Sequence, residues 1–373
     1  MRILYVLTDA KIGGAETLVE TLALRKFPED NVGLVVLLGP DQLSSRLERA
    51  FESVEYLNVS EHSRNLLGMV RGLESAAKRF RPDVIHSNLF HADLVTMLAR
   101  TAGVPKVTTI HTQGFGPRDH PLTKLIARVV GRCSFRFDAA IPTPGSHNFA
   151  RRLGFRNLVD SIPNSADIPD AALFNEESRI FSSIGRFHPV KGHAVLFRSF
   201  AEVLRKHPDW KLVCTGPGLD LSNVELLQII EGAGIRAALE NGSLVLNGST
   251  DDVQAVLGAS SALIISSLYG ETFPMVGVEA NGAGIPVIAT DVGKSGIFAF
   301  DDSYVVPPGD ADALAAAMNR YAGLSSSDRL AMSRAVRTRA VTEFDPRKLV
   351  ARYRDIYTRV IARRAGRPDL ATE

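Results

Sequence analysis

The stretch Tyr269-Gly-Glu-Thr-Phe-Pro-Met-Val-Gly-Val-Glu279 carries two glutamates, Glu271 and Glu279, with seven residues between them. It continues through Ala280-Asn-Gly-Ala-Gly-Ile-Pro-Val-Ile-Ala-Thr-Asp-Val-Gly293, which includes a second apolar strand. Another apolar strand, over residues 262–266, leads into the first stretch. This order of strand, loop, helix and strand predicts a parallel sheet with crossover helices.

The helix within this stretch predicts an anion site. Pro274 suits the first helical turn, where its missing N–H has no cost. The amides of residues 275–277 would then point at an anion. Glu271 precedes the helix, and Glu279 lies about one turn inside it. A phosphate site between two hydrogen-bond-accepting carboxylates suits a nucleotide-sugar.

The segment resembles the E-x7-E motif of retaining glycosyltransferases with the GT-B fold. That family, glycosyltransferase family four or group 1, includes many bacterial cell-surface polysaccharide and glycolipid transferases. The resemblance covers nearly the whole chain and is strongest over residues 180–295. It implies an α/β fold of two doubly wound Rossmann-like domains facing each other across a cleft. It also implies a hexosyltransferase that moves a sugar from a nucleotide-diphosphate donor to a hydroxyl acceptor, such as a lipid-linked or cell-surface glycan precursor.

Apolar strands alternate with amphipathic helices in both halves of the chain. The expected strands are 3–7, 32–38, 84–86, 106–110 and 138–142, then 179–184, 211–214, 244–246, 262–265 and 286–289. Proline and asparagine cluster over residues 160–169, as in an interdomain connection. We therefore expect an acceptor-side domain over 1–165 and a nucleotide-sugar-binding domain over 166–345. The remaining residues, 346–373, contain a helix with an apolar stripe, which in the resembling fold crosses back to the first domain.

Composition fits a globular protein, with 45% apolar and 23% charged residues. Two distant cysteines, Cys133 and Cys214, favour a reducing compartment over a disulfide framework. No apolar run reaches the length of a membrane span, and the first residues turn polar too soon for a signal peptide. We expect a cytoplasmic protein, with any membrane contact peripheral on the inner face of the cell membrane.

The loop after the first strand contains Gly13 and Gly14, which would let the backbone approach a phosphate or sugar closely. It resembles the Gly-Gly-Ala-Glu loop of the family, between donor and acceptor. His111 stands at a strand end, where doubly wound folds place ligands, and matches a family histidine that faces the donor sugar. Thr112 follows it where many relatives have aspartate. The strand end with His86 and Asn88 is a similar, acceptor-side candidate.

In the second half, Arg186 follows a strand and Lys191 stands at the next helix start. Arginine can grip two oxygens of a diphosphate, and lysine adds a point charge. This Gly-Arg…Lys-Gly frame matches the diphosphate site of the family, and the Gly216-Pro-Gly218 turn resembles its nucleotide-bordering loop. The predicted catalytic groups are His111, Glu271, Arg186 and Lys191. The predicted donor contacts are Gly13, Gly14, Gly216, Thr272, Phe273, Pro274, Met275, Val276 and Glu279. The acceptor-side predictions are Glu16, His86 and Asn88.

Charge is uneven along the chain. Residues 1–165 hold 21 basic against 16 acidic residues, which makes this half the better candidate for an anionic partner. Basic residues recur every fourth position at Lys124, Arg128, Arg132 and Arg136, beside an apolar set made of Leu122, Leu125, Ile126 and Val129. This pattern fits either a helix lying on anionic lipid or a solvated face of an ordinary helix.

No metal or other cofactor is expected. Asp310-Ala-Asp312 has the D-x-D spacing of a metal site but precedes an alanine-rich run, which predicts a capped helix start instead. The expected partners are a UDP- or GDP-linked sugar, a glycan or lipid-linked acceptor and an anionic membrane surface, with no nucleic acid. A non-catalytic sugar-nucleotide-binding protein and a sugar-nucleotide epimerase of GT-B-like fold remain alternatives.

Overall fold

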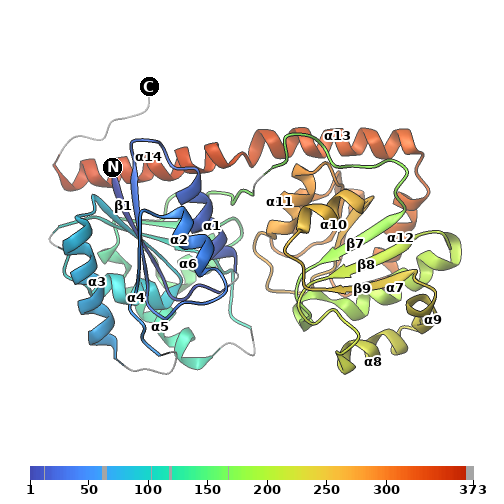
Figure 1. Cartoon of the computed structure of the whole chain (residues 1–373), viewed down its shortest axis with the longest axis horizontal. Coiled ribbons are helices and arrows are strands. Elements are labelled where there is room, and N and C mark those ends of the chain that lie inside the picture. The colour runs from blue at the N-terminus through green and yellow to red at the C-terminus, as the bar shows by residue number, and fades with distance from the viewer. Residues whose placement is uncertain (12, 61–64, 102, 117–119, 167, 367–373) are drawn as a thin grey trace. The chain divides into compact units, whose positions relative to one another are not determined.

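A computed structural model describes residues 1–11, 13–60, 65–101, 103–116, 120–166 and 168–366. The chain divides into two compact units, and the first contains Met1–Ser165 with Pro346–Glu373. The second unit is Ala166–Asp345 (Figure 1). Ile12 in the first glycine loop and Asp167 in the expected connection lie outside the described residues.

The first unit is built on a six-stranded parallel sheet in the order β3-β2-β1-β4-β5-β6. Its strands are β1 Arg2–Leu7, β2 Asn31–Val36, β3 Ser53–Tyr56, β4 Val84–Asn88, β5 Lys106–Ile110 and β6 Ala139–Pro142. Its helices are α1 Gly14–Leu24, α2 Ser44–Ala50, α3 Leu66–Phe80, α4 Phe90–Leu98, α5 Pro121–Arg132, α6 His147–Leu153 and α14 Pro346–Arg364.

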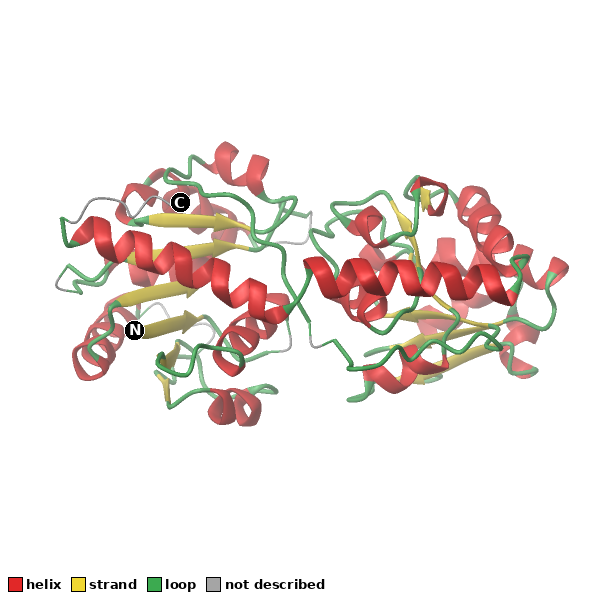
Figure 2. Ribbon diagram, turned by 90° about the horizontal axis from the view of Figure 1, so that it is seen from above, coloured by secondary structure: helices red, strands yellow, loops and turns green. Residues whose placement is uncertain are grey.

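Alternation along β1 explains why helices cover both faces of this sheet (Figure 2). Successive strand side chains point to opposite faces. Ile3 and Tyr5 enter the core that includes residues of α1, α2 and α14. Leu4 and Val6 enter a separate core with residues of α3 and α4. A strand buried on both faces is apolar throughout, as the sequence of β1 is.

The second unit repeats the arrangement, with six strands in the order β12-β11-β10-β7-β8-β9. The strands are β7 Ile180–Ile184, β8 Lys211–Thr215, β9 Leu244–Gly248, β10 Ala262–Ile265, β11 Val287–Thr290 and β12 Val305–Val306. The helices are α7 His193–Lys206, α8 Val224–Gly232, α9 Arg236–Glu240, α10 Val253–Ala259, α11 Met275–Gly282, α12 Ala311–Ala322 and α13 Ser326–Glu343. In both units the strand order reverses beside the first strand, between β1 and β4 and between β7 and β10. Doubly wound sheets bind ligands at the carboxyl edge of such switch points.

The predicted strands lie within two residues of the observed ones, but two strands were missed. β3 is short and only partly buried, and β12 has two residues, so neither gives a clear apolar pattern. The predicted strand 84–86 continues to Asn88, which brings Asn88 to the sheet edge. The Asp310 carboxylate caps α12 by accepting from the Ala313 amide at 2.9 Å, as predicted.

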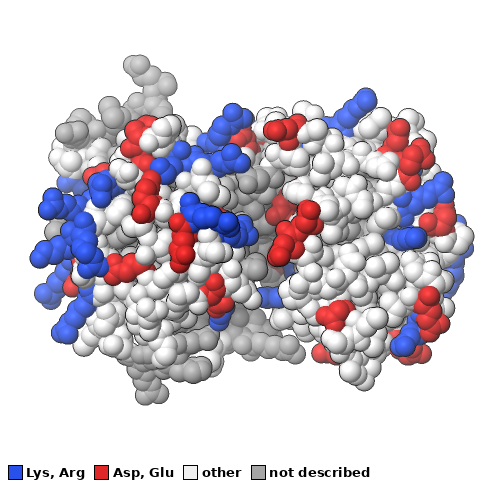
Figure 3. All heavy atoms as spheres, in the orientation of Figure 1, with Lys and Arg blue, Asp and Glu red and all other residues white. Residues whose placement is uncertain are grey.

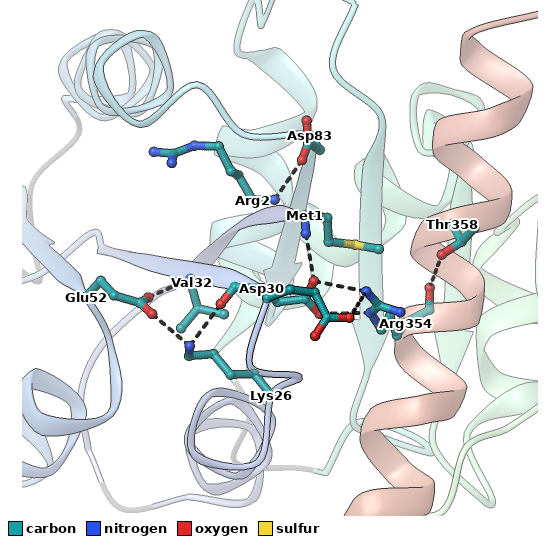
Figure 4. A network of polar contacts seen from close by, with 10 residues as sticks. Met1, Arg2, Lys26, Asp30, Val32, Glu52, Asp83, Arg354 and Thr358 are labelled. Carbon is teal, nitrogen blue, oxygen red and sulfur yellow. Dashed lines mark hydrogen bonds and ion pairs between the residues drawn. The ribbon is translucent and has the colours of Figure 1, made fainter.

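Helix α14 packs on the first unit through its predicted stripe. Its buried side chains are Leu349, Val350, Tyr353, Ile356, Tyr357 and Val360. Arg354 also donates to both Asp30, at 2.9 Å, and Glu29, at 2.7 Å, while the terminal amine of Met1 reaches Asp30 at 2.7 Å (Figure 4). Apolar burial and this ion-pair network together fix the C-terminal helix beside β1 and β2.

Candidate active site

Two loops meet at the carboxyl edge of the second sheet. The Gly185 amide donates to the Thr215 carbonyl at 2.9 Å, and the Phe187 amide donates to the Pro217 carbonyl at 2.7 Å. Gly216 has φ +147°, and a Cβ there would lie 2.3 Å from the Gly185 carbonyl oxygen. Glycine is therefore required for the loops to approach. This fixes the backbone beside Arg186, whose side chain is exposed.

Lys191 and Glu271, predicted separately, form an ion pair. The Lys191 ammonium lies 2.7 Å from Glu271 Oε2, and the Ser267 hydroxyl donates to the same oxygen at 3.1 Å. Their side chains are 28% and 15% exposed, so the pair is partly desolvated but accessible. The stem of Lys191 lies over Gly185, with its Nζ 3.9 Å from where a Cβ would stand. A cation is thus held at the end of β7.

The amino end of α11 differs from the sequence prediction by one residue. Pro274 caps the helix, which starts at Met275. The Gly277 amide donates to the Pro274 carbonyl at 2.9 Å, so it is not available to an anion as predicted. Among the described residues, the amides of Met275 and Val276 have no backbone acceptor. These two amides form the anion-facing end of α11.

Glu279 lies in α11 as predicted and is half-buried. Burial raises the pKa of its carboxyl above the ordinary value. Within the described part of the chain, no side chain or amide donates to its oxygens. A half-buried carboxylate without a protein donor is suited to a ligand hydroxyl, which would supply the hydrogen bond.

The side chain of Phe273, one of the predicted donor contacts, lies in the core. Its ring is 5% exposed and packs edge-on against Phe298 at 5.1 Å and Phe344 at 5.7 Å. The aromatic side chain anchors the loop in the core. Only the backbone of Phe273 therefore lies near the carboxyl edge of the second sheet. Thr272 accepts from the Lys294 amide through its carbonyl at 3.0 Å. Lys294 has φ −120°, which any residue adopts.

At the carboxyl edge of the first sheet, the structure pairs two more predicted residues. His111 Nε2 lies 2.9 Å from Asn88 Oδ1, and because an amide oxygen only accepts, Nε2 carries the proton. Burial lowers the pKa of His111 to about 4, so the ring is neutral near pH 7. Thr112 instead donates to the Gly114 carbonyl at 2.7 Å. Asn88 therefore orients His111, a role that the sequence pattern did not reveal.

His86 is wrong as an acceptor contact. Its side chain is fully buried, and both ring nitrogens are paired, with Tyr357 at 2.7 Å and with Thr109 at 2.8 Å. Burial lowers its pKa to about 3. His86 belongs to the polar contact between β4 and α14, because its side chain points to the face of the sheet that α14 covers.

Glu16 and the glycine pair begin α1. Gly13 is the N-cap with an extended φ of −160°, and a Cβ there would meet Glu16 Oε2 at 2.4 Å. Glycine therefore makes room for the Glu16 carboxyl. Gly14 faces open space. Burial, with nearby Asp9 as a smaller cause, raises the pKa of Glu16 to about 7.

Other residues of the second unit escaped the sequence analysis. Ser267 completes the bonding of Glu271, and Ser266 donates to the Lys191 carbonyl at 2.7 Å. Both follow β10, a position that could have been a signal. His193 begins α7, where burial and then Lys191 lower its pKa to about 4. In the described ranges no three histidine, cysteine or acidic residues are grouped to hold a metal.

Two family models match the chain. Residues 14–165 match the glycosyl transferase 4-like domain, and residues 164–339 match glycosyl transferases group 1. Among curated proteins, the putative glycosyltransferase EpsF of Bacillus subtilis is 27% identical over 319 residues, covering 78% of this chain and 79% of EpsF. A phosphatidyl-myo-inositol mannosyltransferase of Mycolicibacterium smegmatis is 30% identical over 265 residues, covering 66% and 63%.

Solved structures confirm the two-domain GT-B fold. Anabaena HepE, crystallised with UDP, superposes with a TM-score of 0.80 at 21% identity, over 96% of this chain and 100% of HepE. Sucrose-phosphate synthase from Thermosynechococcus elongatus gives 0.78 at 16% identity, over 97% and 100%. With a glycosyltransferase model on each unit, the chain belongs to the superfamily that joins a glycosyltransferase 4-like domain to a group 1 domain.

Proposed function

We propose that this chain is a retaining glycosyltransferase that moves a hexose from a UDP- or GDP-linked donor to a hydroxyl acceptor. The observation that carries the proposal is the edge of the second sheet between β7 and β10. At that edge Lys191 pairs with Glu271, and the Glu279 carboxylate receives no hydrogen bond from a described donor. These three residues occupy the positions that resemble the family motifs. Complexes of HepE with UDP and UDP-glucose support a UDP donor.

In this proposal each group has a separate task. Arg186 and Lys191 stabilise the diphosphate as negative charge grows on it during bond cleavage. The amides of Met275 and Val276 bind phosphate oxygens, as a helix amino end does. Glu279 accepts from the ribose hydroxyls. Glu271 holds Lys191 in place and accepts from the transferred sugar.

For the first unit, the proposal assigns neutral His111 to the transferred sugar and Glu16 to the acceptor. His111, held by Asn88, keeps a fixed orientation, and Glu16 near its pKa can donate or accept a hydrogen bond at neutral pH. Gly14, which faces open space, leaves room for a ligand at the start of α1.

The test is incubation of the protein with UDP-glucose, GDP-mannose and other nucleotide-sugars, with and without a hydroxyl acceptor. Slow release of free sugar without acceptor indicates an enzyme, and NMR of the newly formed sugar shows whether its anomeric configuration is retained. Binding without turnover would favour the non-catalytic protein, and a changed sugar on an intact nucleotide would favour the epimerase.

Metal independence is part of the proposal, because two cations and a helix amino end serve the diphosphate. Transfer should persist in EDTA. A loss of activity that manganese or magnesium restores would refute this part and leave the donor assignment intact.

We propose further that the acceptor is lipid-linked and that α5 contacts an anionic membrane. Three apolar side chains of α5, Leu122, Leu125 and Val129, are 53%, 55% and 40% exposed beside exposed Arg128 and Arg132. Ile126 instead lies in the core. Arg136 lies beyond α5, in the short helix Ser134–Arg136, and Lys124 donates to the Gly116 carbonyl. The similarity to a phosphatidyl-myo-inositol mannosyltransferase supports a lipid acceptor.

A second basic surface supplies the control. Lys and Arg side chains gather on the first unit where α3 lies (Figure 3). Arg71 and Lys78 of α3 are exposed. Sedimentation with phosphatidylglycerol vesicles at low salt should fall when Arg128 and Arg132 become glutamine, since each basic residue adds about 1 kcal/mol. Glutamine at Arg71 and Lys78 should have less effect. If both variants lose vesicle binding equally, the attraction is due to overall charge and α5 makes no specific contribution.

No helix in the described part of the chain is long and apolar enough to cross a bilayer.

A further inference from the structure

The amino edge of the first sheet, opposite to the edge with His111, contains an open pocket of about 300 Å³. Four elements surround it: the end of α4, the start of β5, the short helix Ser134–Arg136 and the end of α14. Its polar lining includes three cations, Lys106, Arg136 and Arg364. Phe135, which is 60% exposed, adds apolar surface, and Met97 lies buried beneath.

The three cations are held by the fold. The Lys106 ammonium donates to the Ala99 carbonyl at 2.6 Å, and Arg136 donates to the Met97 carbonyl at 3.3 Å. Arg364 donates twice to Asp138, through Nε at 2.7 Å and through Nη2 at 3.3 Å. Lysine has three donors and arginine five, so these contacts use only part of the hydrogen-bonding capacity of each group.

Negative charge around the pocket is smaller than the positive charge. Asp138 and Glu74 are the carboxylates that act on Lys106, and Arg136 and Arg364 oppose them. Asp138 is also engaged by Arg364 and the Lys106 amide, and Glu74 accepts from the Arg100 amide. Burial, followed by Arg136, lowers the pKa of Lys106 to about 8. An anion in the pocket would relieve this repulsion.

We propose that this pocket binds a phosphate group, through Lys106, Arg136 and Arg364. Arginine forks match phosphate oxygens in pairs, and a lysine adds a point charge. The exposed ring of Phe135 suits a phosphate ester with a carbon chain. The phosphate comes from either a phospholipid headgroup or a free phosphate ester, and the site is separate from the donor site of the second unit.

The first arm of the test uses inorganic phosphate and a readout local to the pocket. NMR of ¹³C-methylated lysines follows the titration of Lys106, assigned with Lys106→Arg. Phosphate should move its pKa upward from about 8. The phosphate affinity reported by this signal should fall about tenfold in Arg364→Gln. Arg152→Gln, an exposed position of the same unit outside the pocket, should leave the affinity unchanged.

The second arm replaces inorganic phosphate with phosphatidylglycerol vesicles, with phosphatidylcholine vesicles as the neutral reference. Arg364→Gln leaves α5 intact, so sedimentation that this variant weakens identifies a lipid headgroup. A Lys106 response to phosphate without such an effect identifies a free phosphate ester. If phosphate leaves the Lys106 titration unchanged and Arg364→Gln sediments as the wild type does, the proposal is wrong, whatever the outcome for sugar transfer.

Discussion

The two sheets share one strand order but carry opposite chemistry at the same edge. At the edge of the second sheet the groups are charged and partly exposed: Arg186 follows β7, and Lys191 pairs with Glu271. At the edge of the first sheet His111 is half-buried and Glu16 is buried, and burial lowers the pKa of His111 to about 4 and raises that of Glu16 to about 7. Topology therefore sets where a ligand can bind, and burial sets which part of a ligand each edge suits. Our proposal therefore assigns the diphosphate to the charged edge and uncharged hydroxyls to the other edge.

The largest effect is expected from Lys191→Ala. The change removes a cation from the charged edge and leaves Glu271 without its ion pair, so turnover should fall roughly 100- to 1000-fold. Steady-state kinetics with a nucleotide-sugar would measure it. Lys294→Ala, an exposed lysine on the neighbouring loop, is the matched control. Comparable losses in both variants would mean that general positive charge, and not the held cation, matters.

Glu279→Ala should weaken donor binding by about 1–3 kcal/mol, the cost of leaving ligand hydroxyls without their acceptor. Calorimetry with the nucleotide-sugar gives the value directly. Glu225→Ala in the first turn of α8, an exposed carboxylate, should bind as the wild type does. Unchanged affinity in Glu279→Ala would remove the ribose assignment.

Arg186→Ala should lower turnover about 30-fold and change donor affinity less, since a charged hydrogen bond is worth about 2 kcal/mol and the diphosphate gains charge as the bond breaks. Comparing kcat with the calorimetric dissociation constant separates the two effects. If only the affinity changes, Arg186 binds the ground state and has no special role in cleavage.

Asn88→Ala tests the neutral edge. Loss of the 2.9 Å contact to His111 should lower turnover about fivefold, the value of one hydrogen bond of about 1 kcal/mol. Asn88→Asp retains an acceptor and adds negative charge, so the pKa of His111 should rise from about 4. ¹⁵N NMR of the imidazole measures that pKa. If neither substitution changes the ¹⁵N signals or the pKa of His111, Asn88 does not orient the imidazole ring.

The smallest effect on activity should come from Asp93→Asn, which changes stability instead. Burial raises the pKa of Asp93 from 3.8 to about 7. The folded state therefore favours its protonated form. The contribution of Asp93 to the free energy of unfolding is therefore full below pH 3.8 and is lost as pH rises through 7. Asparagine keeps an oxygen for the Ser87 and Thr108 hydroxyls. It should stabilise the protein by roughly 2 kcal/mol at pH 8 and have little effect at pH 4. Equal unfolding free energies of the two proteins at pH 8 would contradict a raised pKa for the buried Asp93 carboxyl.

Much of the fold was predictable because apolar strands and amphipathic helices have distinct periods. The stripe on α14 and the cap at Asp310 follow directly from sequence spacing. β3 and β12 were missed because a short or partly exposed strand leaves no such period. The extension of β4 to Asn88 was missed for another reason: His86, Ser87 and Asn88 are polar but fully buried, and burial of polar groups is decided by tertiary contacts.

The candidate site shows the same division. The sequence of one segment predicted that Glu271 precedes a helix and that Glu279 lies within it, which is local information. The sequence could not predict which residues pair across strands, because Lys191 and Glu271 are 80 positions apart and His111 and Asn88 are 23 positions apart. The side to which a residue points also depends on the layers around it. His86 and Phe273 had the expected sequence positions but point into the protein interior.

Calorimetric titration with UDP, GDP and their sugars is the measurement closest to the central claim, that the charged edge of the second unit binds the nucleotide-diphosphate end of a sugar donor. We expect the wild type to bind at least one of these nucleotides, Lys191→Ala and Glu279→Ala to bind it more weakly, and Asn88→Ala to bind the bare nucleotide normally. No binding of any nucleotide diphosphate, or binding that is weakened by Asn88→Ala and not by Lys191→Ala or Glu279→Ala, would contradict the account.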